Sequence, residues 1–207
     1  MLNKAGKRRV GLMGGTFDPI HNGHIRLAQA AYEECDLDEV VFLPSGEPPH
    51  KQGKRISPAK DRCAMVKLAI AGQDYFSFSD IELKREGRTY TADTLRYLKV
   101  RYPENVFYFL MGADSLLYFE HWQEPETIIG LSALAVAVRD RDDLVVLQKK
   151  RQELLQKFGG EIVLLSMEKI DVSSTLLRQQ LAEGHYDKTL LPESVGEYAL
   201  AHHLYDV

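Results

Sequence analysis

Cysteine and tryptophan are scarce in this sequence of 207 residues, which has two cysteines and one tryptophan. The cysteines, Cys35 and Cys63, form no Cys-x-x-Cys pair, and the sequence contains no His-Glu-x-x-His motif. Zinc usually takes three or four protein ligands, so we expect no metal site built by the chain itself. Each cysteine lies in an apolar helical pattern, and we expect two reduced core thiols in a cytoplasmic protein.

Long apolar runs and an excess of positive charge are also missing. No run approaches the roughly 20 apolar residues of a membrane-spanning helix, and the basic start MLNKAGKRR precedes no signal-peptide core. The 26 Lys and Arg are outnumbered by 30 Asp and Glu, which gives a formal net charge of −4. A broad nucleic-acid surface depends on Lys and Arg that neutralise phosphates. We therefore expect neither a nucleic-acid nor a membrane partner, whereas a local basic pocket stays compatible with the composition.

Short apolar runs alternate with helical patterns along the chain. Most of the runs lack the polar–apolar alternation of half-exposed strands, which is typical of a parallel sheet covered on both faces. Ser57 is the expected N-cap of the second helix, with Pro58 at its first position, and Thr91 is the expected N-cap of the third. The predicted strands are 9–13, 39–43, 75–81, 106–111, 131–138 and 161–165. The predicted helices are 22–35, 58–71, 91–100, 142–158, 174–182 and 192–204.

This order of elements predicts an α/β fold. It is a Rossmann-like, doubly wound parallel sheet with right-handed crossovers, followed by C-terminal helices. We expect a single domain over 1–207, with an α/β core over about 8–166 and a helical extension over about 173–207. Ligands of such sheets bind at the carboxyl ends of the strands. The loops expected there are 14–21, 44–56, 112–123, 139–142 and 166–173.

The loop after the first predicted strand reads GGTFDPIHNGH and combines glycines with two histidines. Gly14 and Gly15 permit close approach of a ligand to the backbone and a positive φ. The helix N-terminus that follows suits phosphate. His21 and His24 share a face of the helix start and can donate to phosphoryl oxygens, while Gly23 leaves room for a ribose or base. A plain strand–turn–helix junction with surface histidines is the alternative interpretation.

This string resembles the nucleotide-binding signature of the nucleotidylyltransferase superfamily. In that signature a His-x-Gly-His or Thr-x-Gly-His follows the first strand and binds the phosphates of a nucleoside triphosphate. The form found here is similar to that of bacterial nicotinate-nucleotide adenylyltransferases. The resemblance implies that His21 and His24 are catalytic. The residues of this loop that it implies for ATP binding are Gly14, Gly15, Thr16, Phe17, His21, Gly23 and His24.

A second candidate anchor, VSSTLLR, lies near the end of the chain. Ser173 or Ser174 is the expected N-cap of the next helix. Helical side chains lean toward the N-terminus, so Arg178 can reach back over the first turn. Hydroxyls, amide groups and a guanidinium then converge at a point that suits a triphosphate, although a capped helix with an exposed arginine is the alternative. The segment resembles the Ser-Ser/Thr-x-x-x-Arg signature of the same superfamily, which implies that Ser173, Ser174, Thr175 and Arg178 bind ATP.

The second substrate is predicted to bind residues spread over several loops. Backbone amides near Thr91 can receive a carboxylate at a helix start, and the ring of Trp122 can stack on a pyridine, with core packing as the alternative. The segments PPHK, RTYTADTL, GADS and HWQ resemble those of nicotinate-nucleotide adenylyltransferases. The resemblance implies a mononucleotide site made of Lys51, Thr91, Asp114, Trp122 and Arg139. In the family Arg139 is usually followed by Pro-Gly, whereas this chain reads RDRDD.

The resemblance implies transfer of the adenylyl group of ATP, with Mg²⁺, to nicotinate mononucleotide, giving nicotinate adenine dinucleotide and pyrophosphate. Because the attacking phosphate is already an anion, no strong base is required. Alternative acceptors are nicotinamide mononucleotide and phosphopantetheine, although enzymes of the latter kind usually carry Thr in place of His21. An alternative of another class is a non-catalytic nucleotide sensor. The sequence leaves open whether the chain forms a homo-oligomer.

Overall fold

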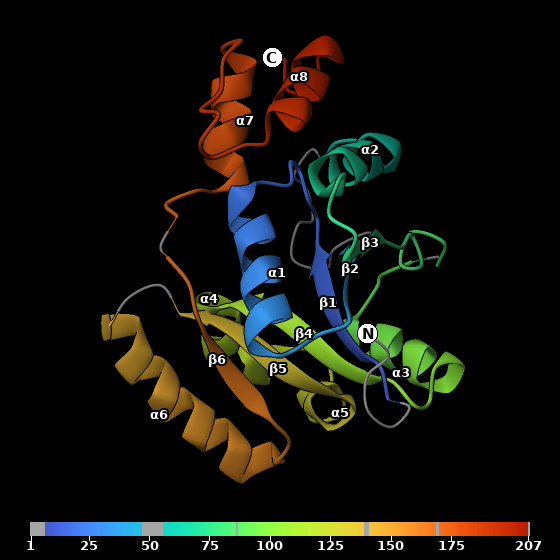
Figure 1. The fold of residues 1–207 in the computed structure, drawn as a ribbon, viewed down its shortest axis with the longest axis vertical. Helices are drawn as coiled ribbons and strands as arrows, with labels where there is room; N and C mark the ends of the chain where they lie inside the picture. The colour runs from blue at the N-terminus through green and yellow to red at the C-terminus, as the bar shows by residue number, and fades with distance from the viewer. Residues whose placement is uncertain (1–6, 47–55, 86, 139–140, 169, 207) are drawn as a thin grey trace. The chain divides into compact units, whose positions relative to one another are not determined.

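Six strands form one sheet in the order β3-β2-β1-β4-β5-β6 (Figure 1). The computed structural model describes residues 7–46, 56–85, 87–138, 141–168 and 170–206. The chain builds β2 and β3 on one side of β1 and then crosses to β4 on the other side, which confirms the doubly wound topology. The strands are β1 Arg9–Gly15, β2 Glu39–Pro44, β3 Phe76–Phe78, β4 Val106–Gly112, β5 Ser132–Val138 and β6 Ile162–Ser166.

The middle of the sheet is apolar because both of its faces are covered. β4 pairs in parallel with β1 and with β5, and β5 pairs in parallel with β6. Five consecutive residues of β4 and six of β5 are buried. The absence of polar alternation in these two segments therefore reflects burial on both sides, as parallel strands require.

Helices follow most strands and supply the covering layers. Their bounds are α1 Asn22–Glu34, α2 Ala59–Ile70, α3 Thr91–Arg101, α4 Ala113–Leu117, α5 Pro125–Leu131, α6 Arg141–Phe158, α7 Ser174–Ala182 and α8 Glu193–Ala201, with a short 3-10 helix over Phe119–His121. None of the helices in the described part of the chain combines the length and apolar character that crossing a bilayer requires.

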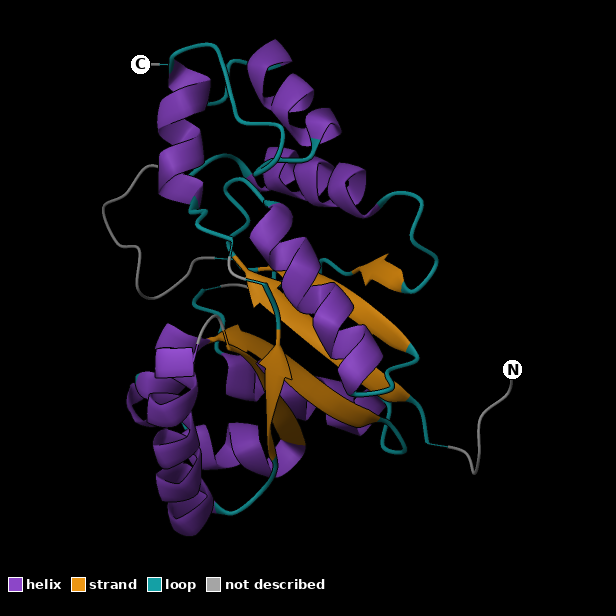
Figure 2. Cartoon of the chain, turned by 60° about the vertical axis from the view of Figure 1, so that its left-hand side comes forward, coloured by secondary structure: helices purple, strands orange, loops and turns teal. Residues whose placement is uncertain are grey.

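The contacts divide the chain into two compact units. Unit 1 holds residues 1–13, 27–41 and 90–169, and unit 2 holds residues 14–26, 42–89 and 170–207. Within unit 1, helices α4, α5 and α6 all pack against β5, and α6 also contacts β6 (Figure 2). Within unit 2, α8 packs against both α2 and α7. Unit 2 contains both sequence motifs that were predicted to bind a triphosphate.

Two predicted helix caps are wrong. Helix α2 begins at Ala59 with Pro58 as its N-cap residue, and α3 begins at Thr91 with Tyr90 in that position; neither cap makes a side-chain hydrogen bond. The amide of Ser57 instead donates to the carboxylate of Asp18, and its carbonyl accepts from the guanidinium of Arg62. These long-range partners determine its position, which a local capping rule does not consider.

The region 112–123, predicted as a loop, is largely helical. It contains α4 and the 3-10 helix, and α5 follows before β5. These elements span five, three and seven residues. Such short segments show too little periodicity to be detected in a sequence window, and burial of Leu116, Phe119, Ile128 and Ile129 stabilises them.

Candidate active site

The loop GGTFDPIHNGH, here called the histidine loop (residues 14–24), connects β1 to α1. β1 extends through Gly14 and Gly15, and neither glycine has a positive φ, so that part of the sequence interpretation is wrong. A Cβ on Gly15 would lie 3.0 Å from a ring carbon of Phe17. Gly15 is therefore needed because the protein's own aromatic ring occupies the space beside it.

Phe17 forms the apolar support of this loop. It is 2% exposed and has φ of +52°, a conformation that is unfavourable for a bulky residue. Its ring lies 6.0 Å from the ring of Phe42 and meets the ring of His24 edge-on at 5.2 Å. Phe17 thus connects the core to one of the two histidines.

The imidazole of His24 is held in one orientation and one tautomer. Its ring stacks on that of His21 at 3.7 Å between centroids and 23° between planes. The backbone amide of His21 donates to Nδ1 of His24 over 3.2 Å. Because Nδ1 accepts this hydrogen bond, a neutral His24 carries its proton on Nε2, which makes that atom a donor. A fixed donor of this kind suits a phosphoryl oxygen.

Gly23 does not leave room for a ligand in the way that the sequence suggested. A Cβ at this position would lie 2.9 Å from Cγ1 of Val172 and 3.1 Å from Nδ1 of His21. The space beside Gly23 is filled by these two side chains. The glycine permits close contact between the histidine loop and the segment before α7.

The second motif meets the histidine loop directly. Ser173 is the N-cap of α7, and its hydroxyl accepts from the amide of Leu176. Ser174 donates from its hydroxyl to the carbonyl of Pro19 over 3.0 Å. Arg178 donates from Nη1 to the carbonyl of Asp18 over 2.7 Å and from Nη2 to Thr175 Oγ1 over 3.0 Å. Motifs separated by about 150 residues of sequence therefore form one structure, and Arg178 reaches back over the first turn as predicted.

A buried arginine, which sequence reasoning missed, holds the opposite side of the loop. Arg62 of α2 is 3% exposed and donates to the carbonyls of Thr16, Ser45 and Ser57 over 2.7, 3.0 and 3.1 Å. Burial lowers the pKa of its guanidinium, and the nearby carboxylate of Asp18 acts in the opposite direction. Arginine keeps its charge in proteins, so these carbonyl dipoles and this carboxylate compensate its burial.

A signal for Arg62 is present in the sequence. Met65 and Val66, three and four positions later, are fully buried. Arg62 therefore lies on the apolar face of its own helix, where an unpartnered charge is very costly. A charged residue on an apolar stripe indicates a buried hydrogen-bond network.

The predicted mononucleotide residues that the structure describes belong to unit 1. Thr91 is the first residue of α3, which places its amide at a helix N-terminus, and Asp114 is exposed in the first turn of α4. Trp122 is half-buried, and its ring meets that of Phe109 edge-on at 5.8 Å. The ring therefore packs against Phe109, and part of it stays accessible. Lys51 and Arg139 lie outside the described residues.

The described residues offer no cluster for a resident metal ion. No group of three or more His, Cys, Asp or Glu is placed to hold one in the part of the chain that the structure describes. Asp18 is the carboxylate of the histidine loop, and its two oxygens accept hydrogen bonds from Tyr205 and Ser57. Cys35 and Cys63 are free thiols, and burial raises the pKa of Cys35 to about 11.

Comparisons with known proteins find similar sequences over nearly the whole chain. Residues 12–180 match the family described as cytidylyltransferase-like. A protein of Lachnoclostridium phytofermentans named "probable nicotinate-nucleotide adenylyltransferase" is 42% identical over 198 residues, which cover 96% of this chain and 99% of the relative. A protein of Dehalococcoides mccartyi with the same name is 44% identical over 201 residues, which cover 95% and 97%.

Solved structures share the fold. The nicotinic acid mononucleotide adenylyltransferase of Plasmodium falciparum, complexed with NaAD, has a TM-score of 0.77 at 21% identity, covering 96% of this chain and 97% of that one. The same protein complexed with APC has a TM-score of 0.76 at 20% identity, with the same coverage. At this level of identity the likeness concerns the arrangement of strands and helices.

Proposed function

The chain belongs to the cytidylyltransferase-like family, and on this premise we propose that it transfers the adenylyl group of ATP to nicotinate mononucleotide. The products are nicotinate adenine dinucleotide and pyrophosphate. The observation that carries the proposal is the direct connection of the two motifs in unit 2, where Arg178 and Ser174 donate to the carbonyls of Asp18 and Pro19. This connection brings the donors of α7 to the loop that carries the two histidines.

The reaction is an in-line displacement at phosphorus. An oxygen of the mononucleotide 5′-phosphate attacks the α-phosphorus of ATP and forms a new P–O bond. The bond from that phosphorus to the oxygen bridging the α- and β-phosphates breaks, and pyrophosphate leaves with the electron pair. Because the nucleophile is already anionic, the protein contributes alignment and stabilisation of charge.

Each ATP-binding residue has a role that follows from its chemistry. His24 donates from Nε2 to the α-phosphate as charge develops, and His21 holds the stacked ring in place and donates beside it. The Ser173–Thr175 turn lies at the start of α7, where amide groups and the helix dipole favour the β- and γ-phosphates. Arg178 adds a guanidinium to this turn.

A divalent cation enters with ATP as part of the substrate, and we propose Mg²⁺. This ion keeps several waters and is usually bound by substrate phosphates with one or two protein carboxylates. The ion neutralises phosphate charge, while the histidines and Arg178 orient the groups that react.

The acceptor site is proposed on the side chains named from the sequence. The amide of Thr91 receives the nicotinate carboxylate, Trp122 stacks on the pyridine ring, and Asp114 accepts from a ribose hydroxyl or an amide. Lys51 and Arg139 bind the mononucleotide phosphate. We place the reaction in the cytoplasm, where two free cysteines stay reduced.

A substrate panel tests the reaction. ATP is mixed with nicotinate mononucleotide, nicotinamide mononucleotide or phosphopantetheine, and pyrophosphate release is measured. We expect the highest kcat/KM with nicotinate mononucleotide. A preference for either of the other acceptors would overturn the substrate assignment, and ATP binding without pyrophosphate from any acceptor would favour a nucleotide sensor.

The His24→Ala variant tests the role of the histidine loop. Loss of one preorganised donor is expected to lower kcat by roughly 10²–10⁴-fold. Unfolding in urea is measured alongside to show that the variant is folded. Full activity in a folded variant would remove His24 from the mechanism.

A further inference from the structure

Asp18, in the middle of the histidine loop, is held by three segments that are distant in sequence. It is 3% exposed. Its Oδ2 accepts from the amide of Ser57 over 3.2 Å, and its Oδ1 accepts from the hydroxyl of Tyr205 over 2.9 Å. Its main-chain carbonyl accepts from Arg178, as described above. All three acceptor oxygens of this one residue are therefore engaged.

The contact with Tyr205 matters because a buried carboxylate needs its hydrogen-bond donors. A buried charge that loses a donor loses compensation that water cannot easily replace. Tyr205 is itself half-buried, and burial of its phenol, together with the negative charge of Asp18, raises its pKa above the ordinary range. The hydroxyl is therefore protonated at neutral pH and donates to the carboxylate.

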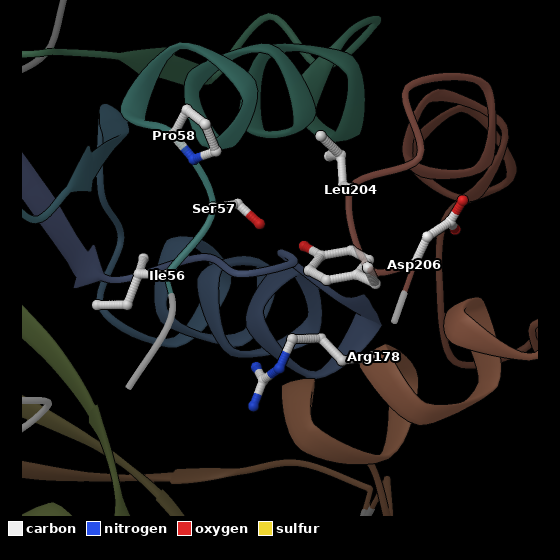
Figure 3. Close-up of a pocket in the computed structure, with 7 residues that line it drawn as sticks. Ile56, Ser57, Pro58, Arg178, Leu204 and Asp206 are labelled. Carbon is white, nitrogen blue, oxygen red and sulfur yellow. The ribbon is translucent and has the colours of Figure 1, made fainter. Parts of the chain in front are cut away.

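Packing alone does not fix this contact, because a cavity lies beside it. A pocket of about 240 Å³ is lined by Ile56, Ser57, Pro58, Arg178, Leu204, Tyr205 and Asp206. Figure 3 shows the residues 56–58 on one wall, Leu204 and Asp206 on the other, and Arg178 below them. Atoms next to a void have no packing partners on that side. Tyr205 lines this pocket and lacks packing partners on that side, so its hydrogen bond to Asp18 contributes to holding the hydroxyl in place.

We propose that Tyr205 is a positioning residue for adenylyl transfer, acting through Asp18 on the histidine loop. By fixing the carboxylate of Asp18 it fixes the main-chain carbonyl to which Arg178 binds, three residues before His21. Loss of the hydroxyl would let the histidine loop and Arg178, the two proposed anchors of the triphosphate, move relative to each other. This inference rests on the proposed function of those anchors.

The chain offers a matched control in a second tyrosine–carboxylate pair. Tyr198 of α8 donates to Oδ1 of Asp61 over 2.9 Å, and Asp61 is 5% exposed. The donor, the acceptor and the distance are the same as for Tyr205 and Asp18. Asp61, however, lies in α2 and not in the histidine loop. Removal of the Tyr198 hydroxyl therefore tests the loss of the same kind of hydrogen bond to a buried carboxylate outside the loop.

The experiment compares Tyr205→Phe with Tyr198→Phe. Unfolding in urea and steady-state kinetics with ATP and nicotinate mononucleotide are measured for both variants, well below their melting temperatures. We expect similar losses of stability. Only Tyr205→Phe is expected to lower kcat/KM for ATP, by roughly 10-fold, because a misplaced group near the reacting atoms reduces the rate. Equal kinetics in the two variants would overturn the proposal.

The outcome is distinguishable from failure of the proposed function itself. If His24→Ala is inactive while Tyr205→Phe has wild-type kinetics, only the positioning role fails. If Tyr205→Phe does not fold, Asp18→Asn is measured in its place. This change removes the negative charge that the donors Ser57 and Tyr205 compensate, and it keeps the shape of the side chain. Wild-type kcat/KM in that variant would also overturn the proposal.

Discussion

At the scale of single residues, the geometry of the histidine loop is set by side chains that contact other parts of the protein. Phe17 packs into the space left by Gly15 and supports His24, and Arg62 holds three main-chain carbonyls. These residues fix the loop before any ligand arrives. Preorganisation of this kind is what allows donors to stabilise developing charge.

Gly15→Ala is expected to disturb the loop through Phe17. The added methyl group meets the ring at 3.0 Å, so the ring must shift and His24 moves with it. Overpacking of this kind costs about 1–3 kcal/mol of unfolding free energy, and kcat/KM should fall as well. Urea denaturation and steady-state kinetics measure both effects.

The control is Gly130→Ala in α5, where no atom lies within 4 Å of the added Cβ. Alanine is the better helix former, so this variant should gain about 0.5–1 kcal/mol and keep its activity. A Gly15→Ala variant that is as stable and as active as wild type would show that Phe17 does not support the loop.

At the scale of elements, the first turn of α7 combines a structural cap with a proposed phosphate site. Ser173 caps the helix. Ser174 donates to a carbonyl of the histidine loop, and Thr175 accepts from Arg178 within the same turn. The position of the helix start therefore decides where its amide groups and guanidinium lie. Stability and ATP affinity are coupled at this element.

Two substitutions of Ser173 separate these effects. Ser173→Ala removes the cap and should cost about 0.5–2 kcal/mol of unfolding free energy. Ser173→Asp keeps a capping oxygen and the stability, but its negative charge should repel the triphosphate and raise KM for ATP. Thermal unfolding and ATP titration of both variants test this. Wild-type ATP affinity in Ser173→Asp would place the triphosphate elsewhere.

At the scale of the whole molecule, ion pairs connect elements far apart in the sequence within unit 1. Lys150 and Lys157 of α6 both donate to the carboxylate of Glu120, and they hold its pKa at about 2 instead of 4.5. Arg96 of α3 pairs with Glu124, whose pKa is also lowered. The folded state therefore favours the charged form of these carboxylates.

This arrangement predicts acid sensitivity. A carboxylate with a lowered pKa in the folded state stabilises fully above its ordinary value of 4.5, and the stabilisation is lost as the pH falls toward 2. The melting temperature of Glu120→Gln should lie below that of wild type at neutral pH, and the difference should shrink over this interval. A difference independent of pH would contradict the role of Glu120. Because the pair is partly exposed, about 1 M salt should reduce the effect.

The sequence alone determined the alternation of strands and helices, the parallel sheet and the two motifs at its loops. Apolar runs without polar alternation identified β4 and β5, because a strand buried on both faces is apolar at consecutive positions. The capping role of Ser173 and the reach of Arg178 were also predictable, because both depend on neighbours within one helical turn. The resemblance of two motifs added the chemistry.

Only the tertiary structure decided which distant residues hold the histidine loop. Arg62, Ser57 and Tyr205 reach residues 16–18 over sequence separations of 46, 39 and 187 residues. It also showed that Gly15 and Gly23 make room for Phe17, Val172 and His21 rather than for a ligand. Local patterns carry no information on such contacts, because a hydrogen bond between distant segments depends on the folded path of the whole chain.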